Sequence, residues 1–186
     1  MTTGGGFAED DAGADGWDDI PGDTALTIRI PEADPLVRAG FPAHVTVLYP
    51  FLHESRIDAP LDRELRALLA GHDAFTLTFA EFGRYPGVLY LDPWPREPVE
   101  ALTKDLTLRW PEVVPYRGIF GAGLEPHLTV ANSEGPETQA AAYDELEAEL
   151  APSLPLVCRV EAVELIVWDG AGWRGRAAYR LGGPDR

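Results

Sequence analysis

The sequence His44-Val45-Thr46-Val47 occurs a second time, almost unchanged, as His127-Leu128-Thr129-Val130. Both copies alternate polar and aliphatic residues, and β-branched side chains favour a strand. Side chains of a strand point to opposite faces in turn, so the histidine and threonine of each copy share one face. The alternative is a pair of half-buried core histidines. With four histidines in the chain, chance predicts fewer than one His-x-Thr, so the repeated motif favours a functional pair.

The residues after each motif predict the same order of elements: a helix, a strand, a turn and a returning strand. For the first copy these elements are predicted at residues 58–70, 75–82, 84–87 and 88–91. For the second copy they are predicted at residues 138–150, 156–168, 169–172 and 173–181. A strand at 25–30, a short helix within 31–40 and a helix at 99–110 complete the pattern.

The two motifs lie 83 residues apart, at positions 44 and 127. Together with the repeated order of elements, this offset predicts two similar lobes related by a pseudo-two-fold axis, with the two histidine strands side by side near it. The predicted class is α+β, with antiparallel sheets and helices packed outside.

The chain divides into a tail and one domain. Residues 1–22 consist mainly of Gly, Ala, Asp and Glu, a composition that buries too little apolar surface to order itself. We expect an acidic, disordered N-terminal tail over residues 1–22 and a single bilobal domain over residues 23–182.

The composition restricts the function classes. The formal net charge is −16, which opposes binding to long duplex nucleic acid because that affinity comes mainly from cations on phosphates. No segment is long and apolar enough to span a bilayer. The single cysteine, Cys158, excludes an internal disulfide framework and a multi-cysteine zinc site. We expect a cytoplasmic protein, a monomer, without membrane contact.

The paired motifs resemble the signature of the two-histidine (2H) phosphoesterase superfamily, and their flanks are similar to 2′-5′ RNA ligase-like proteins. The similar stretches are 41–51 (FPAHVTVLYPF), 82–91 (FGRYPGVLYL), 115–121 (PYRGIFG) and 126–131 (PHLTVA). The resemblance covers residues 25–181 and is more specific for the superfamily than for a substrate.

The resemblance implies a bilobal fold around a central cleft and metal-free chemistry on phosphodiesters. The expected substrates are cyclic phosphates or 2′-5′ linkages of a small nucleotide or an RNA end. His44 and His127 would be the general acid and base, since imidazole titrates near neutral pH. Thr46 and Thr129 would donate to the non-bridging phosphate oxygens. No clustered carboxylate and histidine ligand set marks a metal site, so neither a metal nor another cofactor is expected.

Four further residues are candidates for substrate binding. Arg84, in a predicted turn, and Arg117, in the long connection at 111–126, could each bring a cation to the phosphate. Tyr116 and Phe120 could stack on a base, although core packing explains them equally well. The other two histidines, His53 and His72, follow the ends of predicted elements and are interpreted as surface residues.

Two other functions stay open at this point. The same site could act on a phosphoester of a non-nucleotide metabolite, which suits the acidic charge. A binding protein could also keep the pocket for a phosphate or nucleotide without turnover. The intact pair of histidines and threonines argues against the second alternative, because binding alone needs no proton-transfer groups.

Overall fold

The computed structural model describes residues 19–119, 125–132 and 140–182. In this part of the chain, eight strands form one sheet in the order β6-β3-β4-β5-β2-β1-β7-β8, and every neighbouring pair is antiparallel. The strands are β1 (Thr24–Arg29), β2 (His44–Leu48), β3 (Phe75–Tyr85), β4 (Val88–Trp94), β5 (Leu128–Asn132), β6 (Leu156–Val160), β7 (Ala162–Trp168) and β8 (Trp173–Arg180).

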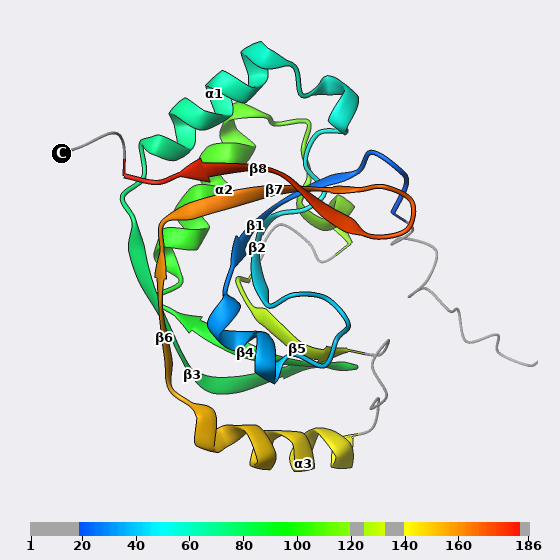
Figure 1. Cartoon of the computed structure of the whole chain (residues 1–186), viewed down its shortest axis with the longest axis vertical. Helices are drawn as coiled ribbons and strands as arrows, with labels where there is room; N and C mark the ends of the chain where they lie inside the picture. Colours follow the sequence, from blue (N-terminus) through cyan, green and yellow to red (C-terminus); the bar gives the residue numbers. More distant parts are fainter. Residues whose placement is uncertain (1–18, 120–124, 133–139, 183–186) are drawn as a thin grey trace, which may run out of the picture.

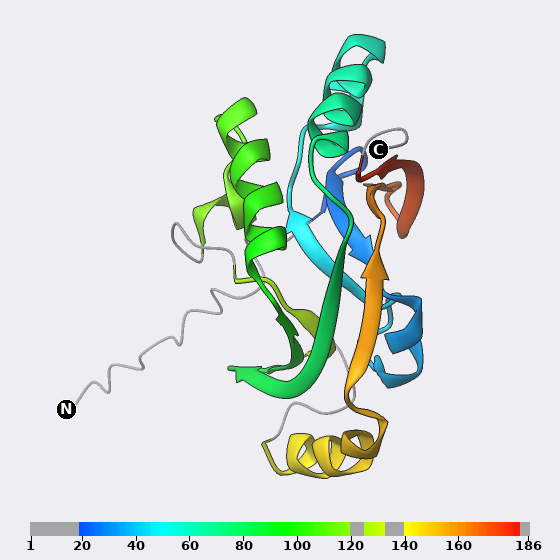
Figure 2. The same cartoon turned by 90° about the vertical axis from the view of Figure 1, so that its left-hand side faces the viewer.

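Three α-helices accompany the described part of the sheet. They are α1 (Ala59–Ala70), α2 (Glu97–Arg109) and α3 (Ala140–Leu150). Figures 1 and 2 show α1 and α2 at one end of the long axis and α3 at the opposite end. The helix expected within residues 31–40 is a short 3₁₀ helix, η1 (Pro31–Leu36), with Pro35 inside it. Proline has no backbone N–H to continue a helix, which accounts for the short length of η1.

The α+β class and the two antiparallel lobes are confirmed. Strands β6-β3-β4-β5 form one half of the sheet and β2-β1-β7-β8 the other. The halves meet where β5 pairs with β2, so the two histidine strands are neighbours, as predicted. The pseudo-two-fold relation stays a prediction, and the repeats are not equivalent strand for strand. Strand β4 lies inside its half beside β5, whereas β8 lies at the edge of the sheet.

The prediction of one long strand over residues 156–168 is wrong. The segment is divided at Glu161 into β6, which pairs with β3, and β7, which pairs with β1. Figure 1 shows the chain running from β6 directly into β7. The apolar pattern is continuous because both strands are partly buried. It therefore gives no sign of the point where the chain changes its partner strand.

The core lies against one face of the central strands. Val45, Val47, Leu128 and Val130 are fully buried there. Helix α2 packs on β2, with the Thr103 hydroxyl donating to the Val47 carbonyl at 2.7 Å. This packing leaves the alternate residues of β2 and β5 on the other face.

Residues 19–22, which the sequence pattern assigned to the disordered tail, are bound to the domain. The Gly22 amide donates to the Trp168 carbonyl at 2.8 Å, and the Tyr49 hydroxyl donates to the Asp19 carboxylate. Their small and acidic side chains carry no core pattern, so these long-range hydrogen bonds could not be predicted from composition. The rest of the predicted tail, residues 1–18, lies outside the described residues.

Candidate active site

The two His-x-Thr motifs lie on one face at the centre of the sheet. Val45 lies opposite Leu128 in the β2–β5 pairing, and both point into the core. His44 and Thr46 therefore share the opposite face with Thr129 and with His127, which immediately precedes β5. All four residues are partly exposed on this face. We call this surface the His–Thr face, defined by His44, Thr46, His127 and Thr129.

The two imidazoles are oriented by the same kind of hydrogen bond. Nδ1 of His44 donates to the Pro42 carbonyl at 2.8 Å, and Nδ1 of His127 donates to the Glu125 carbonyl at 2.9 Å. A carbonyl oxygen can only accept, so Nδ1 carries the proton in both rings. Each Nε2 is consequently a proton acceptor when the ring is neutral and a donor when it is protonated. No hydrogen bond within the described part of the chain uses either Nε2.

Burial lowers the pKa of both histidines below the ordinary value. For His44, desolvation is the main cause, and the positive charges of His127 and Arg29 act in the same direction. Desolvation is also the main cause for His127, where the Arg96 cation lowers the pKa further and the Glu125 charge raises it. In each ring the bond to the carbonyl opposes the decrease. The two rings are close enough that protonation of His127 disfavours protonation of His44.

Two arginines that sequence reasoning missed flank the histidines. Arg29 lies across from His44 in the β1–β2 pairing and donates to both Asp34 oxygens at 3.0 and 2.8 Å. Near His127, Arg96 donates to both oxygens of Asp92 at 2.8 Å. Because Asp92 lies in β4 and Arg96 lies just before α2, no helical spacing in the sequence indicated that pair. The position of Arg29 depends on strand register, which local sequence does not reveal.

Aromatic side chains border His127. The Tyr85 and Tyr90 rings stack with centroids 4.6 Å apart, and each meets the His127 ring edge-on at 5.7 and 5.5 Å. Tyr90 lies over Gly83, where an added Cβ would be 2.2 Å from the Tyr90 ring. Glycine at 83 therefore permits the observed position of Tyr90. The sequence stretch 82–91 contains these residues, but their approach to His127 required the β3–β4–β5 pairing.

The structure brings Tyr116 to the site. Its side chain bonds to Thr46, a contact that favours the charged phenolate, but the larger effect of burial raises the Tyr116 pKa. The Tyr116 ring also meets the Tyr49 ring at 5.8 Å, and the Tyr116 amide donates to the Tyr49 carbonyl at 2.6 Å. Tyr116 thus borders the His–Thr face at Thr46.

Of the remaining described candidates, Arg117 follows Tyr116 directly and Arg84 lies away from the site. Arg117 pairs with Asp23 at 3.0 Å, one residue beyond Tyr116. Arg84 bonds to Asp144 and Glu147 of α3 at 2.7 and 2.8 Å. It lies across from Leu89 of β4, whose side chain is fully buried, so it points away from Tyr85 and the His–Thr face. The structure therefore does not bring Arg84 to the two histidines. Phe120 lies outside the described residues.

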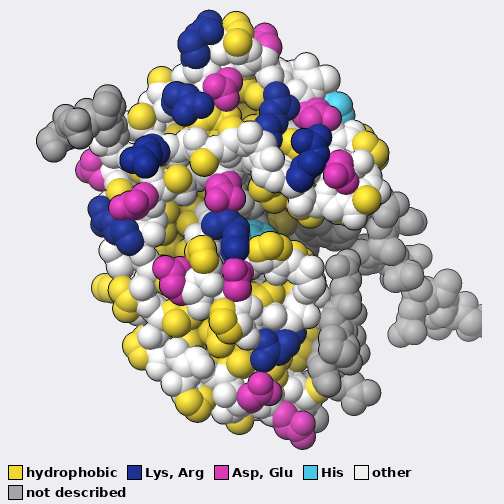
Figure 3. Space-filling view, viewed as in Figure 1, with side chains coloured by type: hydrophobic (Ala, Val, Ile, Leu, Met, Phe, Trp, Pro, Cys, Tyr) yellow, Lys and Arg dark blue, Asp and Glu magenta, His cyan; other side chains and the backbone are white. Residues whose placement is uncertain are grey.

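Many arginines of the described surface are paired with carboxylates. Figure 3 shows dark blue and magenta side chains interspersed on the face in view. Residues 56 and 112 form such a pair at 2.9 Å, and residues 38 and 149 another at 3.3 Å. Within the described ranges, no group of three or more His, Cys, Asp or Glu side chains is placed to hold a metal ion. No helix in the same ranges is long and apolar enough to cross a membrane.

A two-lobed antiparallel sheet with a His-x-Thr motif on each central strand defines the class of fold and site. The sequence model of the 2′-5′ RNA ligase superfamily matches residues 23–172, so the chain belongs to this superfamily. Membership of this superfamily supports the interpretation of the chain as an enzyme of the 2H phosphoesterase kind. No curated protein matches the sequence.

Solved structures agree with this assignment at the level of the fold. Escherichia coli LigT complexed with 3′-AMP has a TM-score of 0.59 and 17% identity, over 87% of this chain and 99% of LigT. The Thermus thermophilus protein TT0787 has a TM-score of 0.59 and 17% identity, over 88% of this chain and 100% of that chain. The predicted resemblance is confirmed.

Proposed function

We propose that the protein is a metal-independent phosphodiesterase that acts on a cyclic phosphate or a 2′-5′ phosphodiester of a small nucleotide or an RNA end. The observation that carries this proposal is the matched orientation of His44 and His127. Each ring uses Nδ1 to fix its position and leaves Nε2 for proton transfer. A binding site for phosphate would have no need of two such groups.

The reaction follows from this arrangement. The neutral histidine accepts a proton through Nε2 from the attacking water or hydroxyl, whose oxygen bonds to phosphorus. The bond from phosphorus to the leaving ribose oxygen breaks, and the protonated histidine donates its Nε2 proton to that oxygen. At the end of the reaction the two protonation states have been exchanged. Either histidine can begin as the base, and the roles reverse in the opposite direction.

The two threonines complete the proposed site. Thr46 and Thr129 lie on the same face as the histidines, and their hydroxyls can donate to the non-bridging oxygens. Negative charge increases on these oxygens as the new bond forms, so the donors stabilise the transition state more than the bound substrate. Tyr116 and Arg117 are proposed to contact the substrate beside Thr46.

A small nucleotide is the favoured substrate. LigT has been solved in complex with 3′-AMP and with NADP⁺, and we extend the nucleotide preference to this chain as part of the proposal. The net charge of −16 disfavours long duplex nucleic acid. The single cysteine suits a reducing compartment, and we propose a cytoplasmic monomer.

The test is turnover by the purified protein in the presence of EDTA. The substrates are 2′,3′-cyclic AMP, 2′,3′-cyclic UMP and a 2′-5′-linked dinucleotide, with products measured by chromatography. We expect cleavage of at least one of them, and loss of cleavage in His44→Ala and His127→Ala. A shift in melting temperature without turnover would instead support a binding protein. No shift and no turnover would favour a non-nucleotide phosphoester.

A further inference from the structure

A pocket lies next to the His–Thr face. It is a pocket of about 390 Å³ between residues 50–56 and residues 112–117. This volume falls in the range of small-molecule sites, which begin at roughly 300 Å³. The proposed phosphodiester chemistry does not use this pocket, so its lining requires a separate explanation.

The lining combines an apolar floor with two flat cations. Phe51, Leu52 and Val113 form the floor and are buried. Arg56 and Arg117 line the same pocket. Apolar side chains with planar guanidinium groups are a combination that binds a flat aromatic ring.

Each of the two cations already has a carboxylate partner. Arg56 pairs with Glu112 at 2.9 Å, and Arg117 pairs with Asp23 at 3.0 Å. These pairs offset the positive charge, so the pocket does not present the unbalanced cation that a phosphate would favour. The guanidinium planes can still stack on a ring. The chemistry of the lining therefore favours an uncharged nucleobase.

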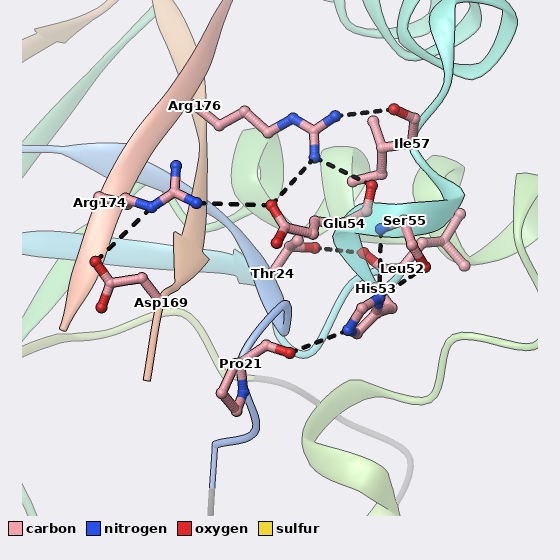
Figure 4. Close-up of polar contacts among 10 residues, drawn as sticks. All are labelled: Pro21, Thr24, Leu52, His53, Glu54, Ser55, Ile57, Asp169, Arg174 and Arg176. Carbon is pink, nitrogen blue, oxygen red and sulfur yellow. Dashed lines mark hydrogen bonds and ion pairs between the residues drawn. The ribbon is translucent and has the colours of Figure 1, made fainter. Parts of the chain in front are cut away.

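The wall of the pocket is held in one conformation. His53 accepts at Nδ1 from the Ser55 amide at 3.3 Å and lies 2.9 Å from the Ser55 hydroxyl, while its Nε2 donates to the Pro21 carbonyl at 3.1 Å (Figure 4). Both ring nitrogens are engaged within the protein, in contrast to the two catalytic candidates. Gly22 makes this possible, since its φ is +98° and a Cβ there would be 2.1 Å from His53 Nε2.

The segment that carries Arg56 is also fastened to the sheet. Arg176 of β8 donates to the carbonyls of Glu54 and Ile57 at 3.1 and 2.9 Å, on either side of Arg56 (Figure 4). The Glu54 carboxylate lies 3.7 and 3.8 Å from the guanidinium groups of Arg174 and Arg176. A pocket with a fixed wall binds its ligand without first having to order the wall.

Two pairs of consecutive residues join the pocket to the His–Thr face. Tyr116 bonds to Thr46, and the next residue, Arg117, lines the pocket. Tyr49 packs on Tyr116, and the next residue, Pro50, lines the pocket. Tyr116 and Arg117 both have positive φ, 47° and 53°. This conformation is unfavourable for residues other than glycine and is found preferentially at functional sites.

We propose that this pocket binds the nucleobase of the substrate while the phosphodiester occupies the His–Thr face. The inference rests on the proposed function and makes it more specific, because it assigns recognition of the base to a particular pocket. Arg56, Arg117 and Val114 then become specificity residues. They contact the base and leave the chemical step to the histidines and threonines.

The test compares two substrates that share a five-membered cyclic phosphate. 2′,3′-Cyclic AMP carries a base, and glycerol 1,2-cyclic phosphate does not. Val114 lines the pocket and is 50% exposed, so Val114→Trp should fill the pocket without disturbing the core. We expect this variant and Arg56→Gln to lower kcat/KM for the nucleotide about tenfold or more, mainly through KM. Activity on the glycerol compound should stay within about twofold of the wild type.

Arg66→Gln is the matched control. Arg66 is 54% exposed and pairs with Asp62 on α1, much as Arg56 is 56% exposed and pairs with Glu112. The control should retain the wild-type preference for the nucleotide. Equal losses on both substrates in the pocket variants, or no loss on either, would overturn the assignment of the pocket.

A failure of the proposed function gives a different result. If the wild type cleaves neither compound and also leaves the 2′-5′-linked dinucleotide intact, the phosphodiesterase proposal falls, and the pocket is tested by calorimetric titration with adenosine alone. Binding by the wild type that is lost in Val114→Trp would support the pocket. No binding, or equal binding by both proteins, would overturn it.

Discussion

Val45 of β2 lies directly opposite Leu128 of β5, and this pair is the point where the two halves of the sheet join. In an antiparallel pair, one step forward on one strand matches one step back on the other. The register therefore sets His44 across from Thr129 and Thr46 across from His127. Each histidine gains the hydroxyl of the other motif as a neighbour, which neither motif provides by itself.

Replacing either histidine of the pair should abolish most of the activity. We expect His44→Ala and His127→Ala each to lower kcat on 2′,3′-cyclic AMP by ~10²–10⁴-fold, because each removes a proton-transfer group. The control is His72→Ala, since His72 pairs with Asp105 at 3.2 Å and should leave kcat unchanged. Full activity in either of the first two variants would remove that histidine from the mechanism.

The pH dependence of kcat/KM should be bell-shaped with an optimum below the ordinary histidine pKa of about 6.5. The reaction needs one neutral and one protonated ring, and burial lowers the pKa of both. Above both pKa values neither ring has a proton to donate, and below both neither ring can accept one. The two sides of the pH profile therefore report the coupled titration of His44 and His127, not of one residue. An optimum well above pH 7 would contradict the proposed protonation states.

Glu125→Gln should move this pH profile to lower values. The Glu125 carboxylate raises the pKa of His127, so its neutralisation removes a charge that favours the protonated ring. The backbone carbonyl that orients His127 is retained in this variant. The measurement is kcat/KM across the acidic and neutral pH range for both proteins. A shift toward alkaline pH would show that Glu125 does not act on the pair through its charge.

Thr46→Val and Thr129→Val should lower kcat more than they raise KM. Loss of a donor to the developing charge costs up to ~10²–10³-fold in kcat at comparable sites. Valine keeps the β-branched shape that the strand favours, so folding should be little affected. If KM alone rises, the hydroxyls contribute only to binding. If neither constant changes, the threonines favour the strand conformation and contribute to neither binding nor catalysis.

Arg84→Gln should leave kcat and KM for the cyclic nucleotide unchanged. Arg84 joins β3 to α3 through two carboxylates and points away from the His–Thr face. Exposed ion pairs contribute little to stability, so the melting temperature should decrease only slightly. A clear rise in KM would instead show that Arg84 contacts the substrate, as the sequence analysis proposed.

The sequence by itself determined the local elements and the residues that share a face. The spacing of Leu61, Leu65, Leu68 and Leu69 predicted α1, and Asp58 begins it by accepting from the Leu61 amide at 2.9 Å. The alternation of His and Thr with aliphatic residues predicted both central strands and their polar face. These features depend on hydrophobic periods of 2 and 3.6 residues, and such a period can be recognised within a short stretch of sequence.

Only the tertiary structure decided which distant residues meet. The β1–β2 register placed Arg29 beside His44, and the β3–β4–β5 pairing placed Tyr85 and Tyr90 beside His127. The same packing directed Arg84 to α3 and away from the histidines. Strand alternation specifies a face but not a partner, because the partner depends on how the whole sheet is assembled and which strand ends up alongside.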